Sequence, residues 1–495
     1  MKKFLLVAAI LLGFLLVGTL HVALSRSLYF DEAVNMYVGK VIASRGGQYE
    51  TGMLGSPWAY PELIVGTVLQ SLTALGFTGF TWTNIAVPAV REVNVLFGAL
   101  TVLFVYLTVR RLWGDQEAIW SAALFGITGC VMFIAGFATY DMPSLALLAG
   151  SVWLSVEATE DGRSAWSGLL LMGVAGIVFG VSFITKYIVV AFLPGLFAIV
   201  FIRRWWFGFV LLVAALTIGL TFVIPRFSAL QGLLSYRGGH GASYGSTPLV
   251  MLYEVAYFVG PLLVLAFMAV GLVKDKWTLA LVILIVSLTT PVCHIVFNDP
   301  LALFKHAAWT AFFACLIAGV TLARLQRFNT LASVALFATL ALFGWYQVRT
   351  LEQFYPDLTT VDAWMQQNIS GTDCNILVDD VWTVKWSLNT TFDTKEYCVA
   401  DEWTWNNKTT SSQDLMSSIY AGTYPYIIYE EGGMFSGDTA VFDQEVIDTV
   451  QTSGRYELVG KFLSFVTWGN AILPPEFRGN LPAYSDVTIL VWKRR

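Results

Sequence analysis

Residues 4–24 read FLLVAAILLGFLLVGTLHVAL, an apolar run long enough to cross a membrane as one helix. Lys2 and Lys3 precede this run, and Asp31 and Glu32 follow it in the stretch SRSLYFDEA (residues 25–33). A basic start before an apolar run also fits a secretory signal peptide. We expect an uncleaved helix, because no small-residue cleavage box stands out and the orientation of the later loops requires a first span.

Similar apolar runs recur through the first 350 residues and predict a polytopic α-helical membrane protein. Of the 495 residues, 56% are hydrophobic and 13% are charged, and the mean hydropathy is +0.66. The apolar segment 59–77, with Pro57, Pro61 and Glu62 at its start, is expected to be a juxtamembrane helix; a true span is the alternative. The sequence predicts about 11 spans, near residues 4–24, 91–109, 117–136, 142–157, 167–183, 187–202, 205–224, 250–273, 277–297, 304–323 and 330–349.

Charge and hydropathy both change near residue 350. The first 350 residues contain 14 acidic and 20 basic side chains, whereas the remainder contains 20 acidic and 9 basic ones. We therefore expect a membrane domain at 1–349 and a soluble domain at 350–495. The overall charge of −5 averages two unlike parts and therefore carries no information about nucleic acid; we expect no nucleic-acid partner.

Short periodic segments in the soluble part predict a small α/β domain. We expect strands at 375–380, 424–429 and 487–492 and helices at 361–368 and 441–452. No glycine-rich phosphate loop follows the first strand, which argues against a nucleotide site. Cys374 and Cys398 could pair in an oxidising compartment, or remain two buried free thiols.

We expect the chain to lie in a plasma membrane or an ER-type membrane. An odd number of spans from a cytoplasmic N-terminus then places the C-terminal domain outside the cytoplasm. Three glycosylation sequons, at Asn368, Asn389 and Asn407, lie in that domain and fit this orientation. The positive-inside rule provides a separate check. The basic residues that should then lie in short cytoplasmic loops are Lys2, Lys3, Arg110, Arg111, Arg203, Arg204, Lys274, Lys276, Arg324 and Arg327.

Ionisable side chains recur at the outer ends of these spans. A carboxylate beside a hydroxyl acceptor can act as a general base, and lysine or arginine can stabilise a phosphate leaving group. Carboxylates from separate loops can also hold a divalent cation, such as Mg²⁺, Mn²⁺ or Zn²⁺. The set suits transfer of a group from a lipid-linked phosphate, or equally cleavage of a lipid phosphate. Its members are Asp31, Glu32, Asp141, Lys186, Tyr187, Arg237, His240, Lys305 and His306.

Each of these residues also has a simpler interpretation. Asp31, Glu32 and Asp141 could cap helix N-termini, where acids are favoured. Lys186 could extend to the lipid headgroups, as lysines at span ends commonly do. The glycine-rich stretch 238–241 could be a flexible loop. The argument for a site is that all of these residues share one predicted side.

Several motifs resemble those of GT-C glycosyltransferases that use polyprenyl-phosphate sugars. The order and spacing of these motifs are similar to the branch of protein O-mannosyltransferases and lipid A aminoarabinose transferases (glycosyltransferase family 39). The resemblance covers roughly residues 1–325; residues 56–62 depart from it where that branch has a His-Pro-Pro-Leu-like stretch. The motifs are Asp31-Glu32, Arg91–Gly114, Ala138–Leu145, Phe183–Tyr187 and Lys305–Trp309.

The resemblance implies transfer of a sugar, with inversion, from a polyprenyl (dolichyl or undecaprenyl) phosphate to an extracytoplasmic glycan, lipid or protein. It implies Asp31 as the base or as a metal-site residue, with Glu32 beside it, and Asp141 as the second acid. Metal ligands would be Asp31, Glu32 and His240. The residues expected to face the lipid phosphate are Lys186, Lys305, Arg237, His306 and Tyr187.

Three other classes remain as alternatives. A transporter or flippase for lipid-linked sugars would place ionisable residues near the middle of spans and show a repeat between halves, and neither is visible. An oligosaccharyltransferase-like enzyme usually has a Trp-Trp-Asp-like motif, which residues 401–405 echo only superficially. A non-catalytic scaffold would bind a partner through its soluble domain.

Overall fold

The structure is a computed structural model that forms two compact units. The first contains residues 2–24 and the helices from residue 88 to residue 351; the second contains residues 25–36 and the chain from residue 352 onward. The described residues are 2–25, 29, 31–36, 87–228, 231, 248–297, 302–354, 357–369, 376–378, 384, 399–400, 412–431, 438–467 and 484–495. The predicted juxtamembrane helix at 59–77 lies outside them.

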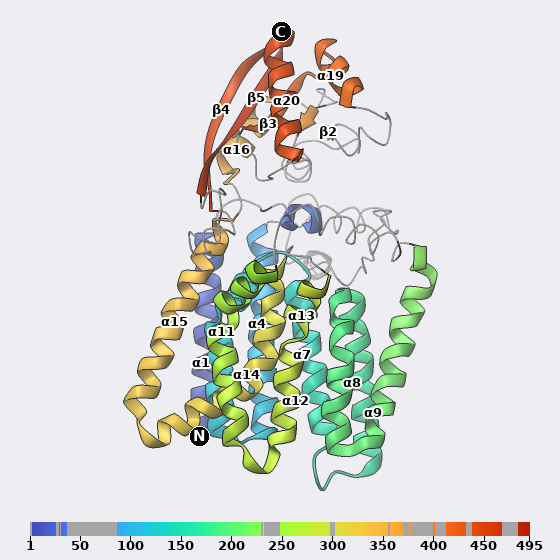
Figure 1. Cartoon of the computed structure of the whole chain (residues 1–495), viewed down its shortest axis with the longest axis vertical. Helices are drawn as coiled ribbons and strands as arrows, with labels where there is room; N and C mark the ends of the chain where they lie inside the picture. The colour runs from blue at the N-terminus through green and yellow to red at the C-terminus, as the bar shows by residue number, and fades with distance from the viewer. Residues whose placement is uncertain are drawn as a thin grey trace, which may run out of the picture. The chain divides into compact units, whose positions relative to one another are not determined.

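The first unit is a bundle of apolar helices (Figure 1), so the chain is a multi-pass integral membrane protein. Among the described residues, eight helical segments are long and apolar enough to cross a membrane, or nine if the bent pair α5 (Asp115–Ile127) and α6 (Gly129–Ala135) forms one span. The eight are α1 (Lys2–Leu24), α4 (Val87–Leu112), α8 (Ala165–Thr185), Tyr187–Arg226, α11 (Pro248–Leu272), Lys274–Val296, α14 (Leu303–Phe328) and α15 (Thr330–Glu352).

α7 (Asp141–Ala158) is shorter, with 18 residues and an acid near each end, and it packs against α8. The segment Tyr187–Arg226 contains the 3-10 helix η3 (Tyr187–Phe192) and α9 (Leu193–Val223). Lys274–Val296 contains α12 (Trp277–Ser287) and α13 (Thr289–Val296). The prediction of a polytopic helical fold is therefore confirmed.

α9 folds back on itself at Arg204. The backbone leaves the helical conformation there, with φ −151° and ψ 93°. The rings of Phe197 and Phe209 lie 5.7 Å apart, although a straight helix rising 1.5 Å per residue would separate their backbones by about 18 Å. The two arms therefore pack against each other, which agrees with the two separate spans predicted at 187–202 and 205–224.

α14 forms the centre of the bundle. In its apolar window, 89% of the residues are buried, and its main neighbours are α11, α5 and α12. A helix that is apolar on all sides is stable only when other helices surround it. Gly319 allows close approach to α5, because a β-carbon there would lie 2.2 Å from Ser121 Oγ. α14 thereby holds Lys305, His306 and Trp309 inside the bundle.

The second unit contains a five-stranded sheet in the order β2-β1-β3-β5-β4. β1 runs parallel to β2 and β3, and β5 runs antiparallel to β3 and β4. The helices are α16 (Thr359–Asn368), α19 (Ser412–Tyr420) and α20 (Asp438–Ser453). The strands are β1 (Ile376–Val378), β2 (Val399–Ala400), β3 (Tyr426–Glu431), β4 (Tyr456–Thr467) and β5 (Tyr484–Arg494).

Side chains alternate between the two faces of this sheet, as strand geometry requires. Ile376, Ile428 and Val491 pack with α16 on one face. Leu377 and Ile427 pack with α19 and α20 on the other face (Figure 1). The predicted α/β architecture is confirmed, including the helix expected at 361–368 and the strands at 424–429 and 487–492. The sequence did not predict β4, a 12-residue edge strand with exposed Leu458 and Leu463.

Candidate active site

Asp141 begins α7 and is buried, and a network of hydrogen bonds fixes the turn before it. The hydroxyl of Thr139 donates to Asp141 Oδ2 at 2.6 Å. Asn94 on α4 donates through Nδ2 to the carbonyl oxygens of Phe137 (2.5 Å) and Thr139 (2.8 Å). An acid is favoured at a helix N-terminus by the helix dipole. The helix dipole therefore favours Asp141 in the first turn, but the N-cap residue is Tyr140 and its side chain does not cap the helix start, so the main interaction of the Asp141 carboxylate lies elsewhere.

Lys186 forms an ion pair with Asp141 inside the bundle. Lys186 follows α8 and has an extended backbone, and its Nζ donates to Asp141 Oδ1. The ammonium group also lies 5.2 Å from the ring centroids of Tyr140 and Trp309, within the range of cation–π attraction. Lys186 is buried and points into the bundle, so the alternative in which it extends to the headgroups is wrong.

Lys305 brings a second ammonium group to the same carboxylate. Lys305 lies in the first turn of α14 and is buried, with Nζ 5.5 Å from the ring of Phe137 and 5.6 Å from the ring of Phe304. Its charge acts on Asp141 together with that of Lys186. Three of the residues predicted from the sequence are thus brought together by α7, α8 and α14.

Two histidines, His306 on α14 and His294 on α13, lie beside this cluster. His306 Nδ1 lies 2.7 Å from Nε2 of His294 on α13, and both side chains are buried. The His306 ring packs edge-on against Trp309 at 5.6 Å, and the same indole ring lies under Lys186. The sequence identified His306 as a phosphate-binding candidate and placed Trp309 at the end of a family-like motif, but it predicted neither the contact of Trp309 with Lys186 nor the pairing of His306 with His294. The four-residue spacing from Lys305 to Trp309 could have indicated a shared helix face.

Tyr187 is the first residue of η3 and is partly buried directly after Lys186. Two other predicted members of the set, Arg237 and His240, lie outside the described residues. Their assignments to the lipid phosphate and to a metal stay predictions.

Asp31 and Glu32 belong to the second unit, where residues 31–36 are helical. The backbone N–H of Tyr29 donates to Glu32 Oε2 at 3.1 Å, and Asn35 Nδ2 donates to the Asp31 carbonyl oxygen at 2.6 Å. A carboxylate that accepts an N–H three residues earlier is part of a helix-capping arrangement. Glu32 is fully buried and therefore helps to shape this turn, whereas Asp31 is partly exposed.

A complete cation site is not formed by these carboxylates. Within the part of the chain that the structure describes, no group of three or more His, Cys, Asp or Glu side chains is arranged to hold a metal. Glu32 already uses one oxygen in the turn. Because His240 lies outside the described residues, the predicted metal ligands Asp31, Glu32 and His240 stay a prediction.

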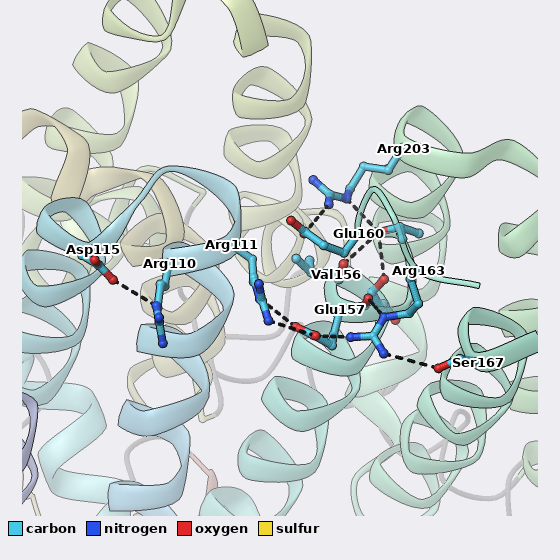
Figure 2. Close-up of polar contacts among 11 residues, drawn as sticks. Arg110, Arg111, Asp115, Val156, Glu157, Glu160, Arg163, Ser167 and Arg203 are labelled. Atoms are coloured by element: carbon cyan, nitrogen blue, oxygen red, sulfur yellow. Dashed lines mark hydrogen bonds and ion pairs between the residues drawn. The ribbon is translucent and has the colours of Figure 1, made fainter. Parts of the chain in front are cut away.

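A second group of charges lies at the opposite ends of α7 and α8 (Figure 2). Arg111 donates through Nε to Glu157 Oε2 at 2.8 Å, and Arg163 also donates to the Glu157 carboxylate. Arg110 pairs with Asp115 at 3.0 Å, and Arg203 donates to the hydroxyl of Thr159 at 2.7 Å. We call these the inner pairs. They include several of the basic residues that the sequence placed in cytoplasmic loops.

Part of the chain matches a known protein family. The family model described as dolichyl-phosphate-mannose-protein mannosyltransferase matches residues 82–228. This range contains Asp141 and Lys186, and it ends before His294 and Lys305. The two residues of the buried ion pair therefore lie within the part of the chain that this family model recognises.

Curated relatives match a similar share of the chain. An undecaprenyl phosphate-α-4-amino-4-deoxy-L-arabinose arabinosyl transferase from Pseudomonas fluorescens is 32% identical over 111 residues, covering 22% of this chain and 19% of that protein. A transferase of the same name from Pseudomonas aeruginosa is 32% identical over 120 residues, covering 23% of this chain and 22% of that protein. The matched segment spans about a fifth of the length of these relatives.

Solved structures match over nearly the whole chain. ArnT from Cupriavidus metallidurans in the apo state has a TM-score of 0.58 at 16% identity, covering 99% of this chain and 97% of that one. The same protein bound to undecaprenyl phosphate has a TM-score of 0.56 at 16% identity, with coverages of 98% and 97%. The apo oligosaccharyltransferase of Archaeoglobus fulgidus has a TM-score of 0.55 at 12% identity, with coverages of 85% and 69%.

These similarities show that the chain has the fold of ArnT from Cupriavidus metallidurans. The sequence matches show a segment similar to the dolichyl-phosphate-mannose-protein mannosyltransferase family model and to the arabinosyl transferases. The resemblance predicted from the motifs is thus confirmed.

Proposed function

We propose that this chain is a membrane glycosyltransferase that transfers a sugar from a polyprenyl phosphate to an extracytoplasmic acceptor. The names of its relatives include an undecaprenyl-phosphate sugar and a dolichyl-phosphate sugar, and one protein of the same fold binds undecaprenyl phosphate. These names support a donor in which a lipid phosphate is the leaving group. The sugar, the lipid length and the acceptor are left open by them.

The observation that carries the proposal is the buried cluster of Asp141, Lys186 and Lys305. Moving an ammonium group from water into an apolar bundle costs several kcal/mol, even when it is paired. Two such groups around one carboxylate form an arrangement that suits an anion arriving from the lipid. The aromatic rings beside Lys186 exclude water and strengthen this attraction.

The proposed reaction is a single displacement that inverts the anomeric carbon. The bond from that carbon to the phosphate oxygen breaks while the acceptor oxygen forms a new bond from the opposite face. The phosphate gains one negative charge, and Lys186 and Lys305 stabilise it as it develops. Asp141 holds the Lys186 ammonium in position. Asp31, following the family resemblance, takes the proton from the acceptor hydroxyl.

We place the catalytic end of the bundle and the C-terminal domain, 350–495, outside the cytoplasm. The basic inner pairs support this orientation through the positive-inside rule. A cysteine introduced at the exposed Glu457 of β4 should react with a membrane-impermeant maleimide in whole cells. Reaction only after the cells are opened would contradict the proposed orientation.

The proposal is tested with purified protein in nanodiscs and a panel of radiolabelled polyprenyl-phosphate sugars. Wild type should release sugar from one donor, while Asp31→Ala and Lys186→Met should release little. Normal turnover by a folded Asp31→Asn variant would show that Asp31 is not the base. Consumption of no donor by a folded wild type that binds the lipid would contradict the enzyme assignment.

The panel also separates the alternatives. A lipid-linked oligosaccharide is included because the fold neighbours contain an oligosaccharyltransferase. Consumption of that donor alone would favour oligosaccharide transfer. Movement of a labelled lipid-linked sugar across proteoliposomes, without release of sugar, would favour a flippase.

A further inference from the structure

The paired histidines His294 and His306 take no part in the displacement proposed above, although both are buried beside the cluster of Asp141, Lys186 and Lys305 and His306 was expected to face the lipid phosphate. Their ring nitrogens lie 2.7 Å apart, so one ring donates an N–H to the other. The indole of Trp309 packs edge-on against the His306 ring at 5.6 Å, and its centroid also lies 5.2 Å from the Lys186 ammonium. The pair is therefore separated from Lys186 by the width of one side chain.

Such a pair can hold one extra proton. When one ring becomes an imidazolium, the bond between the rings becomes a charge-assisted hydrogen bond, which is stronger than a neutral one. A second added proton would place two cations in contact, which is unfavourable. The pair therefore has two accessible states, neutral and singly charged.

The charge around the pair decides which state is favoured. Lys186 and Lys305 are cations and oppose a further positive charge, while Asp141 favours it. α13 packs against α11, α12, α14 and η3, and α12 has no titratable side chain. The titratable side chains of α13 and of these neighbours, together with Lys186 and Asp141, are Cys293, Tyr253, Glu254, Tyr257, Lys305, Arg324, Arg327, Cys315, Tyr187, Lys186 and Asp141.

A bound phosphate would shift this balance. In the donor the phosphate is a diester with one negative charge, and after transfer it is a monoester that gains a second one, since its second pKa is about 6. The indole N–H of Trp309 is fully buried and has no acceptor among the described residues, which fits an acceptor that arrives with the substrate.

We infer that His294 and His306 take up one shared proton when the polyprenyl phosphate monoester occupies the site, and that they thereby stabilise the leaving phosphate. This inference rests on the proposed function. The proton comes from the solvent on binding of the product, or from the acceptor hydroxyl by way of the base during transfer. No other bond is made or broken at the histidines, and the proton returns to solvent when the phosphate leaves.

The test is isothermal titration of undecaprenyl phosphate into the full-length protein in nanodiscs, at pH 7 in buffers of different ionisation enthalpy. Wild type should take up as much as about one proton more per bound lipid than His294→Gln or His306→Gln. The ligand's own titration is common to all proteins, so the difference belongs to the pair. Between pH 8 and pH 6, the affinity of wild type relative to the variants should rise by up to about tenfold per pH unit.

Two further variants serve as controls. His21→Gln removes the remaining histidine of the described residues. His21 lies on α1 and packs near Phe133 of α6, and the proton uptake of this variant should equal that of wild type. The double variant His294→Gln/His306→Gln keeps a donor and an acceptor between the two positions. It should fold and should lose no more proton uptake than either single variant.

Equal uptake by wild type and both single variants, with binding intact, would overturn the inference and leave the proposed function standing. Loss of uptake in His21→Gln would also overturn it. Failure of the wild type to bind any polyprenyl phosphate would overturn both the proposed function and this inference.

Discussion

Asp141 and Glu157 stand at opposite ends of α7, about 24 Å apart along the helix, and each accepts hydrogen bonds from basic side chains. Around Glu157 the partners are partly exposed, with 46% of the Arg111 side chain and 27% of the Arg163 side chain accessible. Around Asp141 they are buried, with 2% of Asp141 and 6% of Lys186 accessible. Exposed pairs contribute little to stability, and buried pairs contain charges that are costly to leave alone.

The difference separates two uses of charge in one bundle. The arginines of the inner pairs stay near water. In the proposed orientation, the positive-inside rule places basic residues on that side of the membrane. The cluster of Asp141, Lys186 and Lys305 keeps its ammonium groups away from water, where their attraction for an anion is stronger. Four experiments test whether the two ends of α7 differ in this way.

The largest effect is expected for Lys186→Met. Removing one partner of a buried ion pair costs about 3–5 kcal/mol, and loss of a group that stabilises the leaving charge lowers transfer by about 10²–10³-fold. Thermal unfolding and sugar release in nanodiscs measure the two effects. Asp141→Asn/Lys186→Met should recover most of the stability and none of the activity. Recovery of activity in this double variant would remove Lys186 from the mechanism.

Lys305→Met should separate activity from stability. Asp141 keeps its bond to Lys186 in this variant, so the unfolding temperature should stay close to that of wild type. Transfer should fall by about 10–100-fold, because one of two cations facing the phosphate is lost. Turnover at increasing donor concentration provides the measurement. Unchanged turnover with a changed unfolding temperature would make Lys305 a structural residue.

Glu157→Gln should show the opposite behaviour. It weakens the contacts of Arg111 and Arg163, each of which contributes at most about 1 kcal/mol because the arginines are partly exposed. We expect a fall of a few degrees in the unfolding temperature and transfer within about twofold of wild type. A large loss of transfer at unchanged stability would indicate that the inner end of the bundle affects the chemistry.

Salt should give the smallest effect. Raising the ionic strength from about 0.05 M to about 0.5 M screens exposed charges but hardly affects buried ones. The stability difference between wild type and Glu157→Gln should therefore shrink, whereas that between wild type and Lys186→Met should not. Parallel unfolding measurements at both salt concentrations test this. Equal shrinkage of both differences would mean that the two ends of α7 are equally exposed.

Most of the fold could be predicted from the sequence because its signals are local. Long apolar runs identify helices that cross a membrane, and short apolar runs identify β3 and β5. The edge strand β4 was missed because Leu458 and Leu463 face outward and blur the alternation. The turn at Arg204 was predicted, since two adjacent arginines interrupt a run too long for one span.

The candidate site could be predicted only in part. Ordering the loops by side placed Asp141, Lys186, Lys305 and His306 together, and the structure brings them into one cluster. The sequence did not predict the hydrogen bond between His294 and His306, because nothing in the sequence pattern shows which two buried histidines face each other. The role expected for Asp31 stays a prediction that the substitutions above test.

Local patterns along the chain are enough to predict a multi-pass membrane protein with an acidic α/β domain and with ionisable residues at the ends of its helices. Composition and periodicity depend only on residues that are neighbours in the sequence, so they can be recognised without the folded structure. The inward direction of Lys186, toward Asp141 45 positions away rather than toward the lipid headgroups, could be seen only in the folded bundle. The packing of α7, α8 and α14 sets the distances between side chains, and those distances decide which charges can act together.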